Sequence, residues 1–252
     1  MKNAIPPLLL LAAATGGCAS HHAFVEPVAD MLRAGVVEDP QQISRLEKAM
    51  TDRDIANLLD AGVRAKLPSA VALAKLTSEC SGFQPRLEPL DANELAAWET
   101  CVEGQPMIRG VRPVSVLSHS SGKPTLHSLR VAGARMGCEL VLVYLQSDST
   151  VDNPNDAAVL YWTLLGLWTA PGNTLEHKTV MQAVLLDSRT GMILGTSTGD
   201  AYAKRDYPAA FAEQRRAELA RDVPAAALAD LQTGTQRLLK QVVEVAVADR
   251  QP

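Results

Sequence analysis

The sequence predicts an α/β fold: a single mixed sheet with an antiparallel hairpin, helices packed on it and a long C-terminal helix. Apolar strand-like segments alternate with amphipathic segments, as in folds that pack helices on a sheet. Two apolar runs flank a short loop at residues 187–191, which is typical of a β-hairpin, here over residues 179–198. Leucine and valine recur at helical spacing over residues 224–248 and predict the C-terminal helix.

The first half of the domain contributes helices and the first strand. Apolar residues near helical spacing predict a helix over residues 41–60. Residues 67–76 predict the first core strand, and residues 78–89 a loop. Asp91 with Glu94 three residues later predicts a capping box that opens the next helix.

The middle of the chain predicts two more strands and a helix. A strand is expected over residues 107–117, and Pro124 is expected in the first turn of a helix. Residues 140–145 are almost continuously apolar, as in a strand covered on both faces. Residues 147–156 are polar and predict a loop.

The N-terminus indicates export. Residues 5–14 form an uncharged apolar run that follows Lys2; the run is too short to span a bilayer and suits a signal peptide. The next residues, Thr-Gly-Gly-Cys ending at Cys18, resemble the bacterial lipobox. By the same resemblance, Ala19 in place of Asp after the cysteine implies sorting to the outer rather than the inner membrane. This resemblance implies a signal peptide at residues 1–17 and acylation of Cys18. An ordinary signal peptide with an incidental cysteine is the alternative.

This organisation places a lipidated tether at residues 18–39 and a periplasmic α/β domain at residues 40–252. Loss of Lys2 with the signal peptide leaves 23 basic and 28 acidic residues, a net charge of −5. Nucleic-acid binding needs a basic footprint, so that class is not expected. No glycine-rich phosphate loop precedes a helix, and no cofactor is expected.

Three cysteines remain after Cys18. In an oxidising periplasm Cys80 and Cys101 are predicted to form a disulfide, which leaves Cys138 as a small core residue at the head of a strand. Zinc is the competing interpretation. The cysteine spacings contain no CxxC pair and the histidines are scattered, so no metal site is predicted.

Two short motifs could suggest hydrolase chemistry. Residues 195–199, Gly-Thr-Ser-Thr-Gly, spell a nucleophile elbow around Ser197, but no histidine follows His177. Ser120 and Lys123 have the S-x-x-K spacing of penicillin-recognising enzymes, without their other elements. We interpret both as structural residues.

Residues 157–171 are the candidate functional segment. They place Tyr161, Trp162 and Trp168 among leucines and valines. The segment is either buried core or an exposed apolar patch; an exposed patch would mark a protein or membrane contact.

Several segments resemble a known family. Gly-Cys-Glu-Leu-Val-Leu-Val at residues 137–143, Tyr-Trp-Thr-Leu-Leu-Gly at residues 161–166 and the hairpin are similar to the core of the rhombosortase-associated (rhombotarget) lipoproteins. More distantly, the strand after Gly-Cys-Glu and the hairpin with its loop at residues 187–191 resemble the periplasmic α/β domain of curli-secretion lipoproteins, penicillin-binding-protein activator lipoproteins and the TolB amino-terminal domain. This resemblance implies a non-enzymatic envelope module.

The sequence therefore predicts an outer-membrane lipoprotein whose non-catalytic periplasmic domain binds another envelope component, with an envelope protein as the expected partner. Self-assembly into a structural homo-oligomer is the alternative, and a lipid-anchored hydrolase is the third hypothesis.

Overall fold

The structure is a computed structural model that describes residues 63, 65–78, 85–115 and 124–248. The expected helix at residues 41–60, the signal peptide, Cys18 and the tether lie outside these residues. The domain boundaries drawn from the sequence stay predictions.

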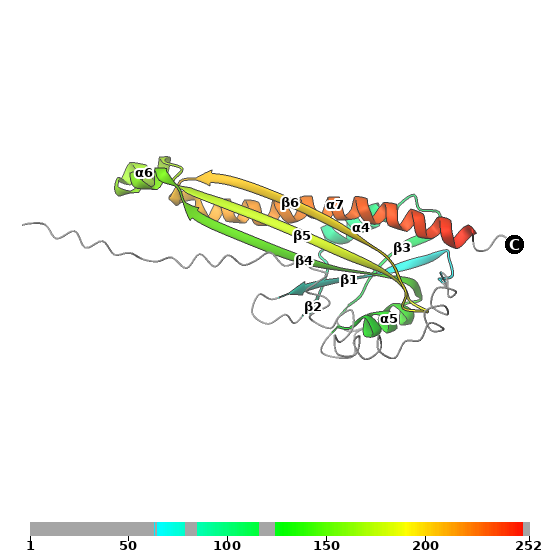
Figure 1. Ribbon diagram of the computed structural model, residues 1–252. Helices are drawn as coiled ribbons and strands as arrows, with labels where there is room; N and C mark the ends of the chain where they lie inside the picture. The colour runs from blue at the N-terminus through cyan, green and yellow to red at the C-terminus, as the bar shows by residue number, and fades with distance from the viewer. Residues whose placement is uncertain (1–62, 64, 79–84, 116–123, 249–252) are drawn as a thin grey trace, which may run out of the picture.

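Six strands form one mixed sheet, which confirms the predicted fold class (Figure 1). The order is β2-β1-β4-β5-β6, and β3 also pairs with β1. β1 runs parallel to β3 and β4, while all other pairs are antiparallel. The strand bounds are β1 Ser69–Ser78, β2 Pro85–Glu88, β3 Ile108–Pro113, β4 Cys138–Pro154, β5 Asn173–Asp187 and β6 Ile193–Tyr207.

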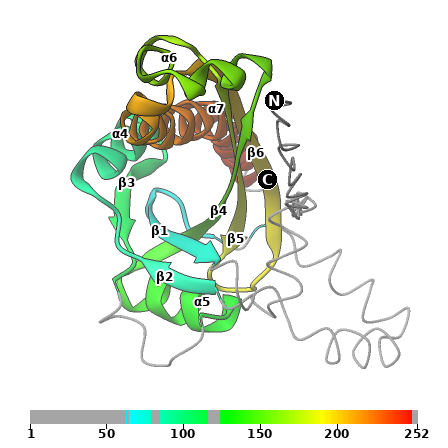
Figure 2. The ribbon, with the colours of Figure 1, turned by 90° about the vertical axis from the view of Figure 1, so that its left-hand side faces the viewer.

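Helices cover both faces of the sheet (Figure 2). The helices α4, Ala92–Val102, and α7, Ala212–Ala248, pack on one face, and α5, Leu126–Arg135, packs on the other. β1 shows this division, because Val71 and Leu73 join the cluster under α4 and α7, while Ala72 and Leu76 join the cluster under α5. A run of apolar residues is therefore buried on both faces.

Local signals account for several element boundaries. Asp91 accepts the backbone N–H of Glu94 at 2.7 Å and Glu94 reaches back to the N–H of Asp91, which confirms the capping box. In the hairpin loop, Asp187 Oδ1 accepts the N–H of Arg189 at 2.7 Å, and Gly191 adopts a φ of 78°. Both features are those expected of Asp and Gly in a short loop.

Some predicted boundaries are wrong. β2 lies within the expected loop at residues 78–89, and β3 is shorter than residues 107–117. Pro124 precedes the N-cap residue Thr125 of α5 and so lies outside the first helical turn, where it was expected. The C-terminal helix begins at Ala212, so Pro224 lies inside it. Leu219 and Val223 pack on Leu175 and Tyr207 ahead of the proline, and this burial offsets the hydrogen bond that proline cannot donate.

The predicted polar loop at residues 147–156 is also wrong, because β4 continues to Pro154 and pairs with β5 along its whole length. The polar side chains on the face toward α7 find partners there. Thr179 donates to Asp148 at 2.6 Å, the Thr150 hydroxyl lies 2.7 Å from His177 Nδ1, and Tyr207 donates to Asp152 at 2.7 Å. Strands β4, β5 and β6 thus form a long ribbon that extends beyond β1.

Candidate functional site: the aromatic tip

The far end of the ribbon carries a compact pair of short helices, which we call the aromatic tip (residues 156–169). A 3₁₀ helix, Asp156–Trp162, is followed by α6, Leu164–Thr169, between the ends of β4 and β5. Figure 1 shows this unit at the extreme end of the molecule, beyond the rest of the sheet.

Polar side chains fix the tip from within. Asn155 accepts the N–H of Ala157 at 3.0 Å and donates to the Pro171 carbonyl at 2.7 Å, which joins the two sides of its base. Thr163 caps α6 by accepting the N–H of Gly166 at 2.9 Å. A Cβ atom at Gly166 would lie 1.9 Å from the Leu160 carbonyl oxygen, so only glycine permits the close approach of the two helices.

The apolar side chains of the tip face outward. Trp162 is 93% exposed, and five further large apolar side chains are more than half exposed. These are Val159, Leu160, Leu164, Leu165 and Trp168. The segment is therefore an exposed patch, and the alternative of a buried core segment is wrong for these residues.

The three aromatic residues predicted from the sequence lie in this one unit but differ in role. Tyr161 is half-buried and its hydroxyl donates to the Tyr207 carbonyl at 3.4 Å, so it joins the tip to β6. Trp162 and Trp168 are exposed. Phe211 was missed by sequence reasoning; its ring lies edge-on to that of Trp168 at 6.1 Å, and only the fold brings it there.

A charged network lies under the tip. Arg216 of α7 pairs with Asp152 at 2.6 Å, and Tyr207 donates to the same carboxylate oxygen. Burial and the hydrogen bond to Asp152 raise the pKa of Tyr207, and the separate hydrogen bond that Arg216 donates to Asp152 raises the pKa of Arg216. Tyr207 and Arg216, both bonded to Asp152, tie the start of α7 to β4 and β6 below the tip.

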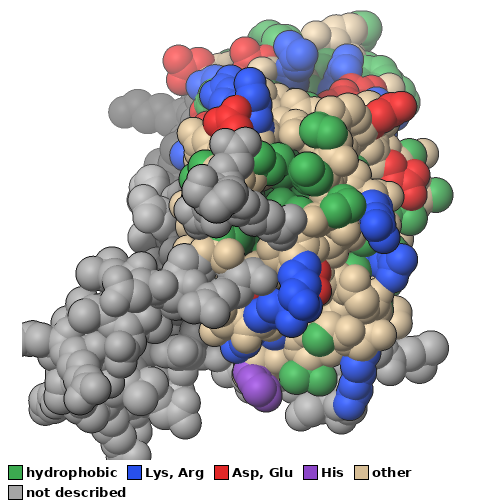
Figure 3. Space-filling model, turned by 90° about the vertical axis from the view of Figure 1, so that its right-hand side faces the viewer, with side chains coloured by type: hydrophobic (Ala, Val, Ile, Leu, Met, Phe, Trp, Pro, Cys, Tyr) green, Lys and Arg blue, Asp and Glu red, His purple; other side chains and the backbone are tan. Residues whose placement is uncertain are grey.

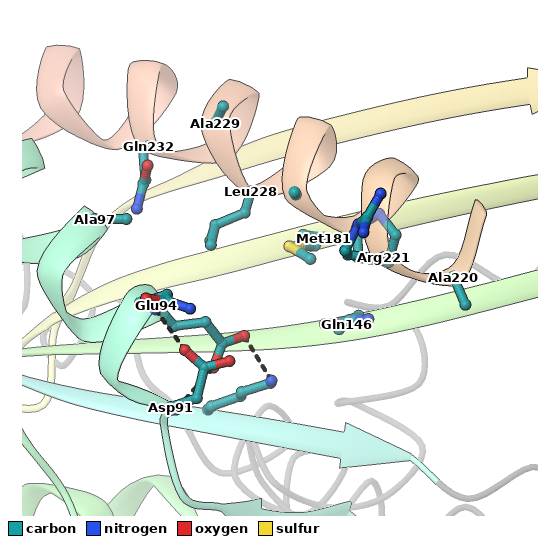
Figure 4. A pocket seen from close by; sticks show the side chains of 14 residues that line it. Asp91, Glu94, Ala97, Gln146, Met181, Ala220, Arg221, Leu228, Ala229 and Gln232 are labelled. Carbon is teal, nitrogen blue, oxygen red and sulfur yellow. Dashed lines mark hydrogen bonds and ion pairs between the residues drawn. The ribbon is translucent and has the colours of Figure 1, made fainter. Parts of the chain in front are cut away.

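A second candidate region is the cleft between α4 and α7, with a volume of about 550 Å³ (Figure 4). Lys75 lies at its edge, nearly buried, with its ammonium 2.7 Å from Glu94 and 3.5 Å from Glu88. Gln232 points into the cleft from α7, and its Nε2 atom has no hydrogen-bond partner among the described residues. Sequence reasoning missed this cleft because its residues come from five separate elements.

The cysteines predicted as site residues do not form a disulfide or metal site among the described residues. Cys101 and Cys138 are buried and form no disulfide with each other, and burial raises the pKa of the Cys101 thiol to about 11. Cys80 lies outside the described residues, so its disulfide with Cys101 stays a prediction. The described part of the chain contains no group of His, Cys, Asp and Glu side chains that could hold a metal ion.

Ser197 occupies the middle of β6, opposite Ala183, and its buried hydroxyl lies 2.8 Å from that of Thr235. A nucleophile elbow needs a sharp turn from a strand into a helix, which this position does not provide. Ser120 and Lys123 lie outside the described residues. No helix in the ranges that the structure describes has the length and apolar character needed to cross a bilayer.

Neither a protein-family model nor a curated protein matches the chain. Among solved structures, it is similar to the LpoB C-terminal domain from Salmonella enterica (14% identity, TM-score 0.30, 58% of this chain and 90% of that one). It is also similar to lipoprotein GNA1162 from Neisseria meningitidis (14% identity, TM-score 0.32, 61% of this chain and 97% of that one). A third similar structure is protein CT253 from Chlamydia trachomatis (12% identity, TM-score 0.30, 70% of this chain and 94% of that one). These TM-scores are too low to carry a family or a function to this chain, and the resemblance to rhombotarget lipoproteins stays a prediction.

Proposed function

We propose that the chain is a bacterial outer-membrane lipoprotein, anchored through Cys18, whose non-catalytic periplasmic domain contacts another component of the cell envelope through the aromatic tip. The lipobox-like residues that end at Cys18 support the anchor. The observation that carries the contact is the exposure of Trp162 and its apolar neighbours at the end of the molecule.

A soluble domain gains nothing in stability from an apolar patch in water. Exposed patches of this kind, when contiguous, mark interaction sites. The internal hydrogen bonds of Asn155 and Thr163 hold the tip in one conformation before any contact, so little ordering entropy is lost on binding.

The test is a photo-crosslink in living cells with the reactive residue at Trp162. We expect a discrete adduct with an envelope component in the lipidated chain, and a lower yield of that adduct in Cys18→Ser. Adducts only between copies of the chain would favour the homo-oligomer instead. Absence of any adduct, with the domain folded, would contradict the proposal.

A further inference from the structure

We propose that the component contacted by the aromatic tip is the surface of a lipid bilayer, into which Trp162, Leu164 and Leu165 insert. This inference rests on the proposed function and names the partner of the same site. Four features of the tip favour lipid over a protein partner.

The first feature is the absence of charge. From residue 157 to residue 175 the chain contains no Asp, Glu, Lys, Arg or His. Asp156 and Glu176 bound this stretch. Protein contact sites are enriched in arginine beside tryptophan and tyrosine, and they have a polar rim. A stretch of Trp, Leu, Val and Thr without charge instead matches the interface of a bilayer, where aromatic rings with one polar atom are favoured.

The second feature is that polar groups of the tip are hydrogen-bonded to one another. Entry into lipid is costly for a carbonyl or N–H that has no partner. Thr163 Oγ1 donates to the Leu160 carbonyl at 2.9 Å, and Thr169 Oγ1 donates to the Leu165 carbonyl at 2.8 Å. The hydroxyls of Thr163 and Thr169 are thus paired with carbonyls of the tip itself and are not left without a partner toward lipid.

The third feature is shape. The tip lies at the outermost point of the ribbon (Figure 1), so it can touch a planar surface before any other described element does. The end of the molecule opposite the tip, shown in Figure 3, instead carries Lys, Arg, Asp and Glu side chains scattered among apolar ones. Among the described residues, exposed tryptophan occurs only within the uncharged stretch of residues 157–175.

The fourth feature is the reach of the chain between the anchor and the domain. Ala70, the second residue of β1, pairs with Cys138 at the end of the ribbon away from the tip, so the described chain enters the sheet at that end. β5 has 15 residues and is about 50 Å long. With residues 41–60 helical, as the sequence predicts, residues 18–62 can span about 110 Å, so the tip can reach the same membrane that holds Cys18. An acyl anchor and an inserted tip would then act as two membrane signals in one chain.

The test uses residues 18–252 with Cys18→Ser, so that no acyl chain contributes, and sonicated vesicles of neutral phosphatidylcholine. Trp98 is the third tryptophan and is fully buried, so Trp98→Phe restricts emission to the tip. We expect vesicles to shift this emission to shorter wavelength and brominated lipid to quench it. Vesicle sedimentation of the chain with native Trp98 gives a second readout if Trp98→Phe does not fold.

The matched variants are Trp162→Ser with Leu165→Ser in the tip, and Ile193→Ser with Val245→Ser elsewhere. All four residues are exposed and apolar. The tip pair should weaken partitioning at least about tenfold, and the control pair should leave it unchanged. Because residues 157–175 carry no charge, added anionic lipid or 0.5 M salt should change partitioning by less than about twofold.

Three results would overturn the inference: no partitioning, partitioning that needs anionic lipid and falls with salt, or equal losses in the two variant pairs. A dimer that forms through the tip in sedimentation equilibrium, without vesicle binding, would also overturn it. A protein adduct at Trp162 in cells, without vesicle binding, would overturn the lipid assignment and leave the proposed function standing.

Discussion

Trp98 in α4 is fully buried, and its ring lies 5.5 Å from that of Tyr144, whereas Trp162 in the tip is 93% exposed. Each residue lies in a short helix whose N-terminal end is capped by a side chain. The helices differ in their other residues. α4 carries the exposed Glu99 on a side that does not face the core, while the tip carries apolar residues on its outer side.

The difference shows how the same residue type serves two purposes. A helix with a polar side and an apolar side buries the apolar one. In α4 the apolar side carries Trp98, which packs against α7 and the sheet. The outer side of the tip has no described element facing it, so its tryptophans stay available for contact. The four changes below test this contrast, in order of their expected effect on stability.

The largest loss should follow Trp98→Ala. Removal of a fully buried indole leaves a cavity between α4, α7 and β4, and the free energy of unfolding should fall by about 3–5 kcal/mol. Urea unfolding followed by circular dichroism measures this. A loss below about 1 kcal/mol would mean that Trp98 is not a core residue.

Gly199→Ala should come next. Its Cβ would lie 2.3 Å from the backbone N of Leu231, so α7 would have to move away from β6. Overpacking of this kind costs about 1–3 kcal/mol. Thr198→Ala, an exposed neighbour in β6, is the control and should unfold at nearly the same urea concentration as the parent chain.

Glu139→Gln should have a smaller, pH-dependent effect at the end of the ribbon opposite the tip. The hydrogen bond from Arg189 lowers the pKa of Glu139, so the ionised pair stabilises the fold at neutral pH. This contribution is lost as pH falls through the lowered pKa. We expect Glu139→Gln to cost about 0.5 kcal/mol at pH 7 and almost nothing in strong acid, where the parent glutamate is also neutral. A difference that grows in acid would contradict this assignment.

Trp162→Ser should change the free energy of unfolding least, by less than about 0.5 kcal/mol in either direction, because the side chain buries almost no surface. The same variant should lose the contact made by the tip. A loss of stability as large as that of Trp98→Ala would remove the contrast between the two residues.

The sequence predicted the elements whose signals are local. Three predictions depend only on neighbouring residues, and the structure confirms each of them: the capping box at Asp91, the hairpin loop with Asp187 and Gly191, and a strand that includes residues 140–145. The extension of β4 over Asp148 and Thr150 was missed because polar residues normally indicate a loop. Their partners, Thr179 and His177, are distant in sequence.

The tip shows the same limit for the functional site. Composition identified Tyr161, Trp162 and Trp168 as candidates, but exposure depends on whether another element covers them. That is a property of the whole fold. Phe211 and the cleft at Gln232 depend on contacts between distant segments, so no local pattern marks them.

The most direct test of the central claim is acrylamide quenching of tryptophan fluorescence, before and after addition of envelope membranes. In Trp98→Phe the remaining fluorescence comes from the tryptophans of the tip. In Trp162→Ser with Trp168→Ser it comes from Trp98 in the core. We expect the tip tryptophans to be strongly quenched in the free chain and protected by membranes, while Trp98 stays protected throughout. Tip tryptophans that are already protected in the free chain, or that membranes leave fully accessible, would contradict the account.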